Sequence, residues 1–278
     1  MTDQARNLRS ATTAMSSALL PAIAVTGGKG GVGKTAIAVN LALMLARLGL
    51  RPLLVDFDLS LANADVLLGL NPTVSLHDVV MGYAPLASVA MQAPGGIGFV
   101  PAASGVDELT RLSDVQLGRL HAGLQQLSTD YDLLVIDTAA GIGREVMATL
   151  KASRITLVVV TPDPTSLADA YALIKVLERD EPGKDIRVVV NMANHQSDGL
   201  ETYNRLRKVV ATYLHRDVPL AVAMPRDSKV SDAVRGRRPF VGGPDSPAVL
   251  ALRTLAMRMK AEPWRPPTNL SDRRASSF

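Results

Sequence analysis

The sequence predicts a single α/β domain in which a mostly parallel sheet carries helices on both faces. Two patterns indicate this fold class. Short runs rich in Val, Ile and Leu alternate along the chain with longer segments of helical apolar periodicity, which is typical of parallel sheets covered on both sides. A glycine-rich turn also follows the first such run and opens the first helix-length segment. The chain of 278 residues is 47% hydrophobic, enough to bury the core of one large domain.

The short apolar runs are expected to form the strands. They span Ile23–Thr26, Pro52–Asp56, Gly98–Pro101, Leu133–Asp137, Thr156–Thr161, Arg187–Asn191 and Pro219–Met224. Most of them end in a polar side chain, and the residues at those ends are Thr26, Asp56, Asp137, Thr161 and Asn191. Because ligands of open α/β sheets bind beyond the carboxyl ends of the strands, we expect these residues to line one crevice.

Helix-length segments lie between these strands, with apolar residues at helical spacing. They span Lys34–Leu48, Asp114–Leu127, Ser166–Arg179, Leu200–Leu214 and Pro247–Lys260. The nearest approach to a membrane span, Ala36–Leu50, is interrupted by Asn40 and Arg47 and is too short. No secretory signal is evident either, so we expect a cytoplasmic protein, with peripheral contact at the membrane or cell pole left open.

The two ends differ in composition from the body of the chain. Residues 1–18 join a short charged segment to a stretch of small and polar residues typical of a flexible linker. Residues 262–278 are rich in Pro, Arg and Ser. We therefore expect one domain over residues 19–261, preceded by a short helix and linker in 1–18 and followed by a tail without packed structure in 262–278.

Composition excludes several kinds of site. The absence of cysteine removes disulfides, thiolate zinc sites, a cysteine nucleophile and cysteine-bound iron–sulfur clusters. Aromatic residues make up only 4%, which argues against a base-stacking platform for single-stranded nucleic acid. Charge is uneven, with 15 basic and 19 acidic residues over 1–200 against 15 and 7 over 201–278. This basic excess fits an acidic partner, nucleic acid, anionic lipid or simply a solvated surface.

The glycine-rich turn has the sequence of a phosphate-binding loop. Gly28–Thr35 reads G-K-G-G-V-G-K-T and matches the P-loop pattern between a strand and a helix. Its glycines allow backbone N–H groups to surround a phosphate at the positive end of the helix. Lys34 is expected to reach the β- and γ-phosphates of a nucleotide, and the Thr35 hydroxyl to bind Mg²⁺. The predicted nucleotide-binding residues of this loop are Gly28, Lys29, Gly30, Gly31, Val32, Gly33, Lys34, Thr35 and Ala36.

Carboxylates stand at the ends of two expected strands. Asp56 and Asp58 lie two residues apart after the second strand, so we expect both side chains to point toward the phosphates. Asp137 ends another buried strand and is followed by T-A-A-G, in which Gly141 lets the loop approach a γ-phosphate. Asp137 is therefore expected to serve as the Walker B carboxylate, which contacts Mg²⁺ through water.

A second lysine distinguishes this loop from an ordinary P-loop. With Lys29 included, K-G-G-V-G-K-T resembles the deviant P-loop of the MinD/ParA family of dimerising ATPases. The resemblance implies a homodimer formed with ATP and Mg²⁺, in which Lys29 crosses the interface to the partner's nucleotide. A second cation beside a triphosphate is useful only when two subunits enclose the nucleotide.

The same resemblance implies roles for residues outside the loop. Asp58 would orient or deprotonate the attacking water, and Asp56 would lie near Mg²⁺. Asn63 would belong with them to the first switch, which is the segment that follows the second strand. Asn191 and Pro225, each at the end of a later strand, would contact adenine. The predicted catalytic residues are Lys29, Lys34 and Asp58, and the predicted metal-binding residues are Thr35, Asp56 and Asp137.

Several segments resemble one branch of this family, the FlhG/FleN flagellar-number ATPases. These segments are Val25–Gly31, Asn63–Leu70, Val100–Gly105, Asp137–Gly143 and Pro164–Lys175. The match covers about residues 20–260. It implies a slow, partner-regulated ATPase that controls flagellar number and placement. Its implied partners are an FlhF-like GTPase and a flagellar transcriptional activator or switch-complex protein.

The first residues carry the D-Q-A-x-x-L-R pattern of that branch. Asp3 is suited to cap a short helix that places Gln4 and Leu8 on one face. Seven residues are too few for a stable isolated helix, so we expect this one to order only against a partner. The resemblance implies that Asp3, Gln4, Ala5, Leu8 and Arg9 contact and activate the FlhF-like GTPase.

Two departures from the family pattern leave alternatives open. Ser60 replaces the glycine usual in the first switch, and Pro247–Lys260 fits a covering helix better than a lipid anchor, so membrane contact stays open. The alternatives are a ParA-type DNA-partitioning ATPase, a MinD-type division-site ATPase and a metabolic P-loop kinase. The N-terminal pattern favours the flagellar branch, and no specific nucleic acid is expected as a partner.

Overall fold

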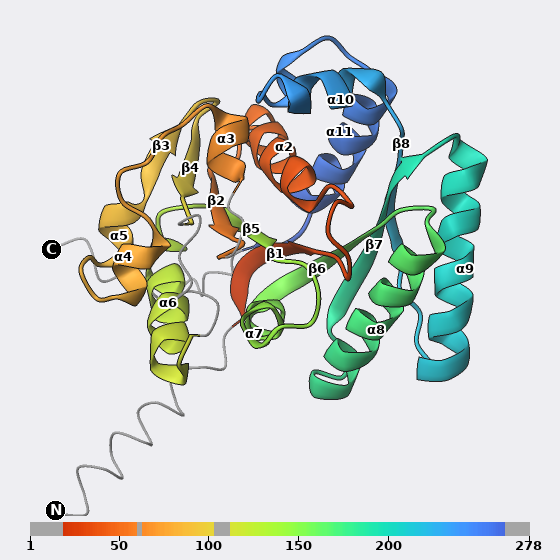
Figure 1. The fold of residues 1–278 in the computed structure, drawn as a ribbon, viewed down its shortest axis with the longest axis horizontal. Helices are drawn as coiled ribbons and strands as arrows, with labels where there is room; N and C mark the ends of the chain where they lie inside the picture. Colours follow the sequence, from red (N-terminus) through yellow and green to blue (C-terminus); the bar gives the residue numbers. More distant parts are fainter. Residues whose placement is uncertain (1–18, 60–62, 103–111, 265–278) are drawn as a thin grey trace, which may run out of the picture.

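An eight-stranded sheet forms the centre of the computed structural model, which describes residues 19–59, 63–102 and 112–264 (Figure 1). The strands are β1 (Leu20–Thr26), β2 (Pro52–Phe57), β3 (Met91–Ala93), β4 (Ile97–Val100), β5 (Leu133–Thr138), β6 (Ser153–Val160), β7 (Asp185–Ala193) and β8 (Leu220–Pro225). Their order in the sheet is β3-β4-β2-β5-β1-β6-β7-β8, and only β3 and β4 pair antiparallel among the described strands. The predicted mostly parallel sheet is therefore confirmed.

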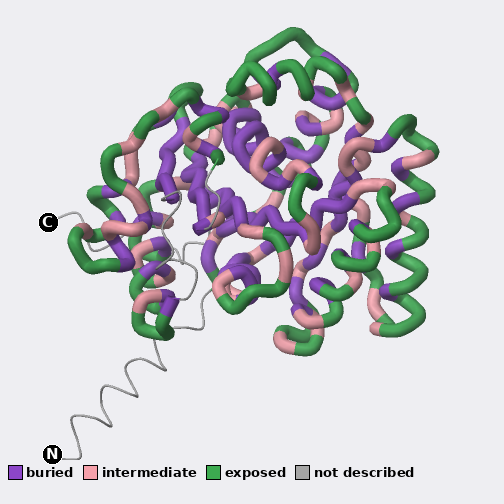
Figure 2. Tube along the Cα trace, in the orientation of Figure 1, coloured by how far each residue is buried: buried purple, intermediate pink, exposed green. Residues whose placement is uncertain are grey.

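Helices cover both faces of this sheet, as expected (Figure 1). They are α2 (Lys34–Arg47), α3 (Ala64–Leu68), α4 (Leu76–Val80), α5 (Leu86–Val89), α6 (Asp114–Leu127), α7 (Arg144–Ala152), α8 (Pro164–Asp180), α9 (Gln196–Leu214), α10 (Ser228–Arg235), the 3₁₀ helix η2 (Phe240–Gly242) and α11 (Pro247–Lys260). Alternate side chains of β1 face opposite layers, because Ile23 and Val25 pack with α2 and α11 whereas Ala24 packs with α7, α8 and α9. Burial is accordingly concentrated in the sheet and on the inner helix faces (Figure 2).

Sequence patterns locate the long helices and the parallel strands but miss the short elements. β3, α3, α4, α5, α10 and η2 are at most eight residues long, too short to display a period. The patterns also miss α7, although Val146, Met147 and Leu150 are buried at helical spacing along its nine residues. Most of these elements lie at the edge of the sheet or beside the strand ends, so missing them does not change the predicted central layers.

The packed structure continues past the domain boundary expected at residue 261. Trp264 is buried, and its indole N–H donates to the Met259 carbonyl at 2.7 Å. The Arg154 guanidinium lies 5.9 Å from the centre of the Trp264 ring, and Glu262 pairs with Arg187 at 2.7 Å. The first three residues of the expected tail therefore belong to the domain.

The C-terminal helix α11 is a covering helix of the fold. Leu252, Leu255, Ala256 and Met259 are buried, and the helix packs against α2 and β8. Among the described residues, no helix has the length and apolar character that crossing a membrane requires. Asp3, Gln4, Ala5, Leu8 and Arg9, predicted to bind a partner, lie outside the described residues, as does Ser60.

Candidate nucleotide-binding site

A cleft of about 1130 Å³ opens at the carboxyl ends of the strands. It is bounded by the glycine-rich loop, by the segment after β2, by the segment after β5 and by the ends of β7 and β8. The predicted site residues that line it are Gly30, Gly31, Gly33, Lys34, Thr35, Ala36, Asp58, Asn63, Asn191 and Pro225. A volume of this size accommodates a nucleotide. A cleft is therefore present at the strand ends, but of the five strand-end residues expected to line it only Asn191 does. Thr26, Asp56 and Asp137 are buried, and Thr161 lies outside the lining.

The glycine-rich loop connects β1 to α2 in a shape that requires glycine. Gly31 and Gly33 have φ angles of 78° and 93°, in the left-handed region that other residues rarely adopt. Gly28 is constrained differently, because a Cβ there would lie 2.3 Å from the backbone carbonyl carbon of Asp169 in α8. Gly28 therefore packs on α8 instead of lining the cleft, and Lys34 is 8% exposed.

Lys29 does not face the cleft but is bound by its own chain. Its Nζ lies 2.8 Å from an Asp163 carboxylate oxygen and donates to the Thr165 hydroxyl at 2.5 Å. Asp163 also caps α8, because it accepts a bond from the Thr165 backbone N–H at 2.9 Å. The hydrogen bond from Lys29 is the main cause that lowers the pKa of Asp163 to about 2. Sequence reasoning misses this contact, because a D-P-T-S helix start gives no sign of a partner 134 residues away.

Asp56 organises the loop that follows β2. One carboxylate oxygen accepts from the Asp58 N–H at 3.1 Å, and the other from the N–H groups of Asn63 and Ala64 at 3.2 and 3.1 Å. β2 ends at Phe57, and Asp58, the next residue, lines the cleft, whereas Asp56 is 1% exposed and does not line it. Both carboxylates act on the same group, since each of them raises the pKa of Asp137.

Asp56 and Asp137 form a buried carboxylate pair. They are register partners on the adjacent parallel strands β2 and β5, and both are almost completely inaccessible to solvent. Burial is the largest cause that raises the pKa of Asp56 to about 7, against the lowering effect of its three backbone hydrogen bonds. Burial and the neighbouring Asp56 raise the pKa of Asp137 well above its ordinary value.

The surroundings of Asp137 fit a bound cation. Neither carboxylate oxygen has a hydrogen-bond partner of acceptable geometry among the described residues, although the Thr35 hydroxyl and the Lys34 ammonium face it and favour its charged form. Mg²⁺ prefers hard oxygen ligands and is commonly held by one or two carboxylates together with substrate phosphates. The described residues contain no group of three or more His, Cys, Asp or Glu side chains that could hold a metal ion.

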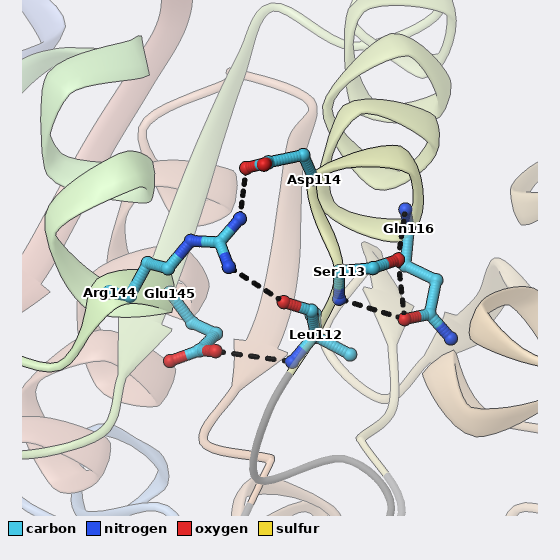
Figure 3. Close-up of polar contacts among 6 residues, drawn as sticks. All are labelled: Leu112, Ser113, Asp114, Gln116, Arg144 and Glu145. Atoms are coloured by element: carbon cyan, nitrogen blue, oxygen red, sulfur yellow. Dashed lines mark hydrogen bonds and ion pairs between the residues drawn. The ribbon is translucent and has the colours of Figure 1, made fainter.

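The segment after β5 joins the glycine-rich loop to α6. The Gly141 N–H donates to the Gly27 carbonyl at 3.0 Å, and Gly141 has a φ of 92°. At the start of α7, Arg144 pairs with Asp114 and donates to the Leu112 carbonyl, while Glu145 accepts from the Leu112 N–H at 3.2 Å (Figure 3). A movement of this segment would therefore shift its contacts with Leu112 and with Asp114, in the first turn of α6.

The ends of β7 and β8 carry the two residues expected to contact adenine. Pro225 ends β8, and Asn191 lies near the end of β7, where its side-chain amide donates to the Val32 carbonyl at 2.8 Å. Val32 is buried and does not line the cleft. Several further residues line the cleft here but were not predicted from the sequence, namely Arg226, Val230, Val234, Arg235, Arg237 and Phe240. They belong to α10 and its flanking segments, where the sequence shows no helical period long enough to recognise.

The chain is similar to known nucleotide-binding proteins. Residues 23–240 match the model of the CobQ/CobB/MinD/ParA nucleotide binding domain. The chain is 45% identical to antiactivator FleN of Pseudomonas aeruginosa, over 89% of this chain and 88% of that one. It is 35% identical to flagellum site-determining protein YlxH of Helicobacter pylori, over 67% and 63%. The structure resembles septum site-determining protein MinD from Pyrococcus horikoshii in complex with Mg-ADP, with a TM-score of 0.74, 25% identity and coverage of 86% and 96%. The chain therefore belongs to the MinD/ParA family of ATPases, with antiactivator FleN among its relatives.

Proposed function

We propose that this ATPase is an ATP-dependent dimerising switch that regulates flagellar number and placement. Similarity to an antiactivator and to a flagellum site-determining protein supports the flagellar assignment. The proposal of a switch depends on one observation, the different placement of the two lysines of the glycine-rich loop. Lys34 is buried at the base of the cleft, whereas the Lys29 side chain is 41% exposed outside it. A cation on the outer side of the loop is placed to reach a nucleotide held by a second copy of the chain.

The cleft residues divide the work of binding and hydrolysis. The loop N–H groups and Lys34 bind the phosphates, and Thr35 with the buried Asp137 holds Mg²⁺, which would neutralise phosphate charge. Asp58 orients or deprotonates the attacking water from the rim of the cleft. Asp56 keeps the first switch in shape through its backbone hydrogen bonds and lies near the metal.

Lys29 exchanges partners when the dimer forms. In the single chain it is held by Asp163 and Thr165, and in the dimer it turns to the phosphates of the partner's nucleotide. Exposed ion pairs of this kind are weak, so a triphosphate displaces the carboxylate readily. ATP thereby favours one state of the protein, and a coupling of about 3 kcal/mol changes partner affinity roughly 150-fold.

Substitutions at the two ends of the Lys29–Asp163 contact are expected to act in opposite directions. Lys29→Ala should abolish ATP-dependent dimerisation, because the nucleotide loses its second cation. Asp163→Asn retains a good cap for α8 but removes the ion pair with Lys29 and so holds it less firmly, and dimers should form at a few-fold lower protein concentration. Sedimentation or light scattering with and without ATP measures both.

The ion pair between Lys151 and Asp180, at 2.9 Å, provides a matched control remote from the cleft. Lys151→Ala should leave dimerisation unchanged. The proposal that Lys29 reaches the nucleotide of a second copy is wrong if the unsubstituted protein stays monomeric with ATP. It is also wrong if Lys29→Ala dimerises as well as the unsubstituted protein.

Part of the basic charge of residues 201–278 stabilises the fold, which bears on the DNA-partitioning alternative. Many of these cations already serve the fold: Arg258 and Lys260 donate to backbone carbonyls of β8 and of the residue after α2. Others are paired with carboxylates, namely Arg205, Arg207, Arg216, Arg235 and Arg253. Binding to duplex DNA at low salt that falls steeply with added salt would favour the alternative instead.

We further propose that residues 3–9 contact an FlhF-like GTPase, and that a flagellar transcriptional activator or switch-complex protein is a second partner. Deleting residues 1–9 should leave basal ATP hydrolysis unchanged and return GTP hydrolysis by the partner to its unstimulated rate. Leu8→Ala should have the same effect, since a helix over this segment would place Leu8 on the same face as Gln4. Asn7→Ala, on a position that the pattern leaves free, is the control. Equal stimulation with and without the segment would contradict this assignment.

A further inference from the structure

The side chain of Asn191 is in direct contact with the phosphate-binding loop. Its Nδ2 donates to the Val32 carbonyl at 2.8 Å, across 159 residues of sequence. The adjacent loop residue is equally close, since a Cβ on Gly33 would lie 2.4 Å from the same nitrogen. The amide of Asn191 is therefore packed against the turn that opens α2.

An irregularity at the end of β7 places the amide there. The register between β7 and β8 shifts between Val190 and Ala193, and the intervening Met192 has a φ of 57°, unusual for a residue with a side chain. The Met192 side chain also reaches the loop, with its methyl carbon 3.8 Å from the Cβ position of Gly33. Strained backbone of this kind is characteristic of functional sites.

The same stretch is tied to the other side of the cleft. The Arg226 N–H donates to the Ala193 carbonyl at 2.6 Å, which links the end of β8 to the end of β7. Pro225 and Arg226 line the part of the cleft next to Asn191. Backbone and side-chain hydrogen bonds thus connect this wall of the cleft to the phosphate-binding loop.

The chemistry of an amide allows two partners at once. Asn offers two N–H groups and a carbonyl oxygen, and the bond to Val32 uses one N–H. The second N–H and the oxygen remain available on the side of the cleft that Asn191 lines. A residue that only recognised a base would not need the loop contact.

We propose that Asn191 is a positioning residue for the phosphate-binding loop, which holds the Val32 carbonyl so that the loop N–H groups converge on the phosphates before any base is bound. This inference rests on the proposed nucleotide binding and adds to it a role independent of adenine. Removing the donor leaves the carbonyl of a buried residue with one partner fewer and frees the loop to turn.

The test compares a ligand with a base and a ligand without one. Binding of Mg-ATP and of Mg-tripolyphosphate is measured by calorimetry for the unsubstituted protein, Asn191→Ala and Asn191→Asp. We expect Asn191→Ala to weaken both ligands by a similar factor, roughly tenfold. Asn194→Ala is the matched control, because the Asn194 amide bonds only Asp198, at 2.9 Å, among the described residues.

The pH dependence of Asn191→Asp separates positioning from a general loss of packing. At pH 8 the carboxylate cannot donate to Val32, and both ligands should bind more weakly than to Asn191→Ala. Relative to the unsubstituted protein, binding should recover only as the pH falls to about 4, the ordinary pKa of an Asp side chain, because a protonated carboxyl donates again.

Two results overturn the proposal. One is tripolyphosphate binding that is equal in Asn191→Ala and in the unsubstituted protein while ATP binding falls, which assigns Asn191 to the base alone. The other is an unsubstituted protein that binds ATP but no tripolyphosphate. A loop that Asn191 holds in place before any base is bound should bind phosphates without a base. Failure of the unsubstituted protein to bind ATP contradicts the proposed function itself.

Discussion

Replacing Asp58 by alanine is expected to lower the rate of ATP hydrolysis at least about a hundredfold while ATP binding and the ATP-dependent dimer persist. Asp58 lines the cleft beyond the end of β2, outside the phosphate-binding loop. The substitution leaves Lys34 and Thr35, the predicted phosphate and metal ligands of the loop, in place. Its backbone N–H, which donates to Asp56, is retained in the variant, so the first switch keeps its main hydrogen bonds.

Two measurements are needed to interpret that variant. Single-turnover phosphate release reports hydrolysis, and light scattering in the presence of ATP reports the dimer, which should accumulate because it is no longer dissolved by turnover. Asp65→Ala is the matched control: Asp65 lies in the first turn of the neighbouring helix α3 but does not line the cleft. Hydrolysis within a few-fold of the unsubstituted rate would remove Asp58 from the catalytic residues.

The layers of the fold were predictable because their signals are local. A buried parallel strand such as β5 is a continuous apolar run, and α2 combines a helical period with the glycine-rich turn that precedes it. The phosphate-binding loop was predictable for the same reason, since its eight residues act through their own backbone. Short elements such as β3 and α10 owe their structure to tertiary contacts and have no such signal.

The state of the site residues was not predictable, because it depends on contacts between distant segments. Lys29 is bound by Asp163, and Asn191 by Val32, across more than a hundred residues in both cases. Local sequence places Asp56 and Asp137 at strand ends but does not show that β2 and β5 are neighbours. Their mutual burial, and the electrostatic cost that it creates, follows from the strand order alone.

That cost gives the stability of the nucleotide-free protein a defined pH dependence. The pKa of Asp56 is raised to about 7, and that of Asp137 is raised well above its ordinary value. Between about pH 4 and pH 7 the folded chain therefore holds protons that the unfolded chain has released. Stability falls as pH rises through this window, since protonation of the folded state is what makes burial of these groups tolerable.

Asp137→Asn should accordingly make the nucleotide-free protein more stable and the ATPase inactive. An amide has nearly the shape of the carboxyl group but carries no charge, so its burial should raise the free energy of unfolding by about 1–3 kcal/mol at pH 7.5. The gain should shrink toward pH 4, where the carboxyl group of the folded state is protonated and no longer carries a buried charge. Urea unfolding at both pH values measures it, with the exposed Asp130→Asn as the control.

The same substitution should reverse its effect once nucleotide is present. The buried carboxylate of Asp137, which faces the Thr35 hydroxyl, fits a cation better than an amide does, so Mg-ADP should stabilise the unsubstituted protein more than Asp137→Asn. ATP hydrolysis by the variant should fall at least about a hundredfold for the same reason. A variant that is less stable than the unsubstituted protein without nucleotide, or that hydrolyses ATP normally, would show that Asp137 serves the fold and not the metal.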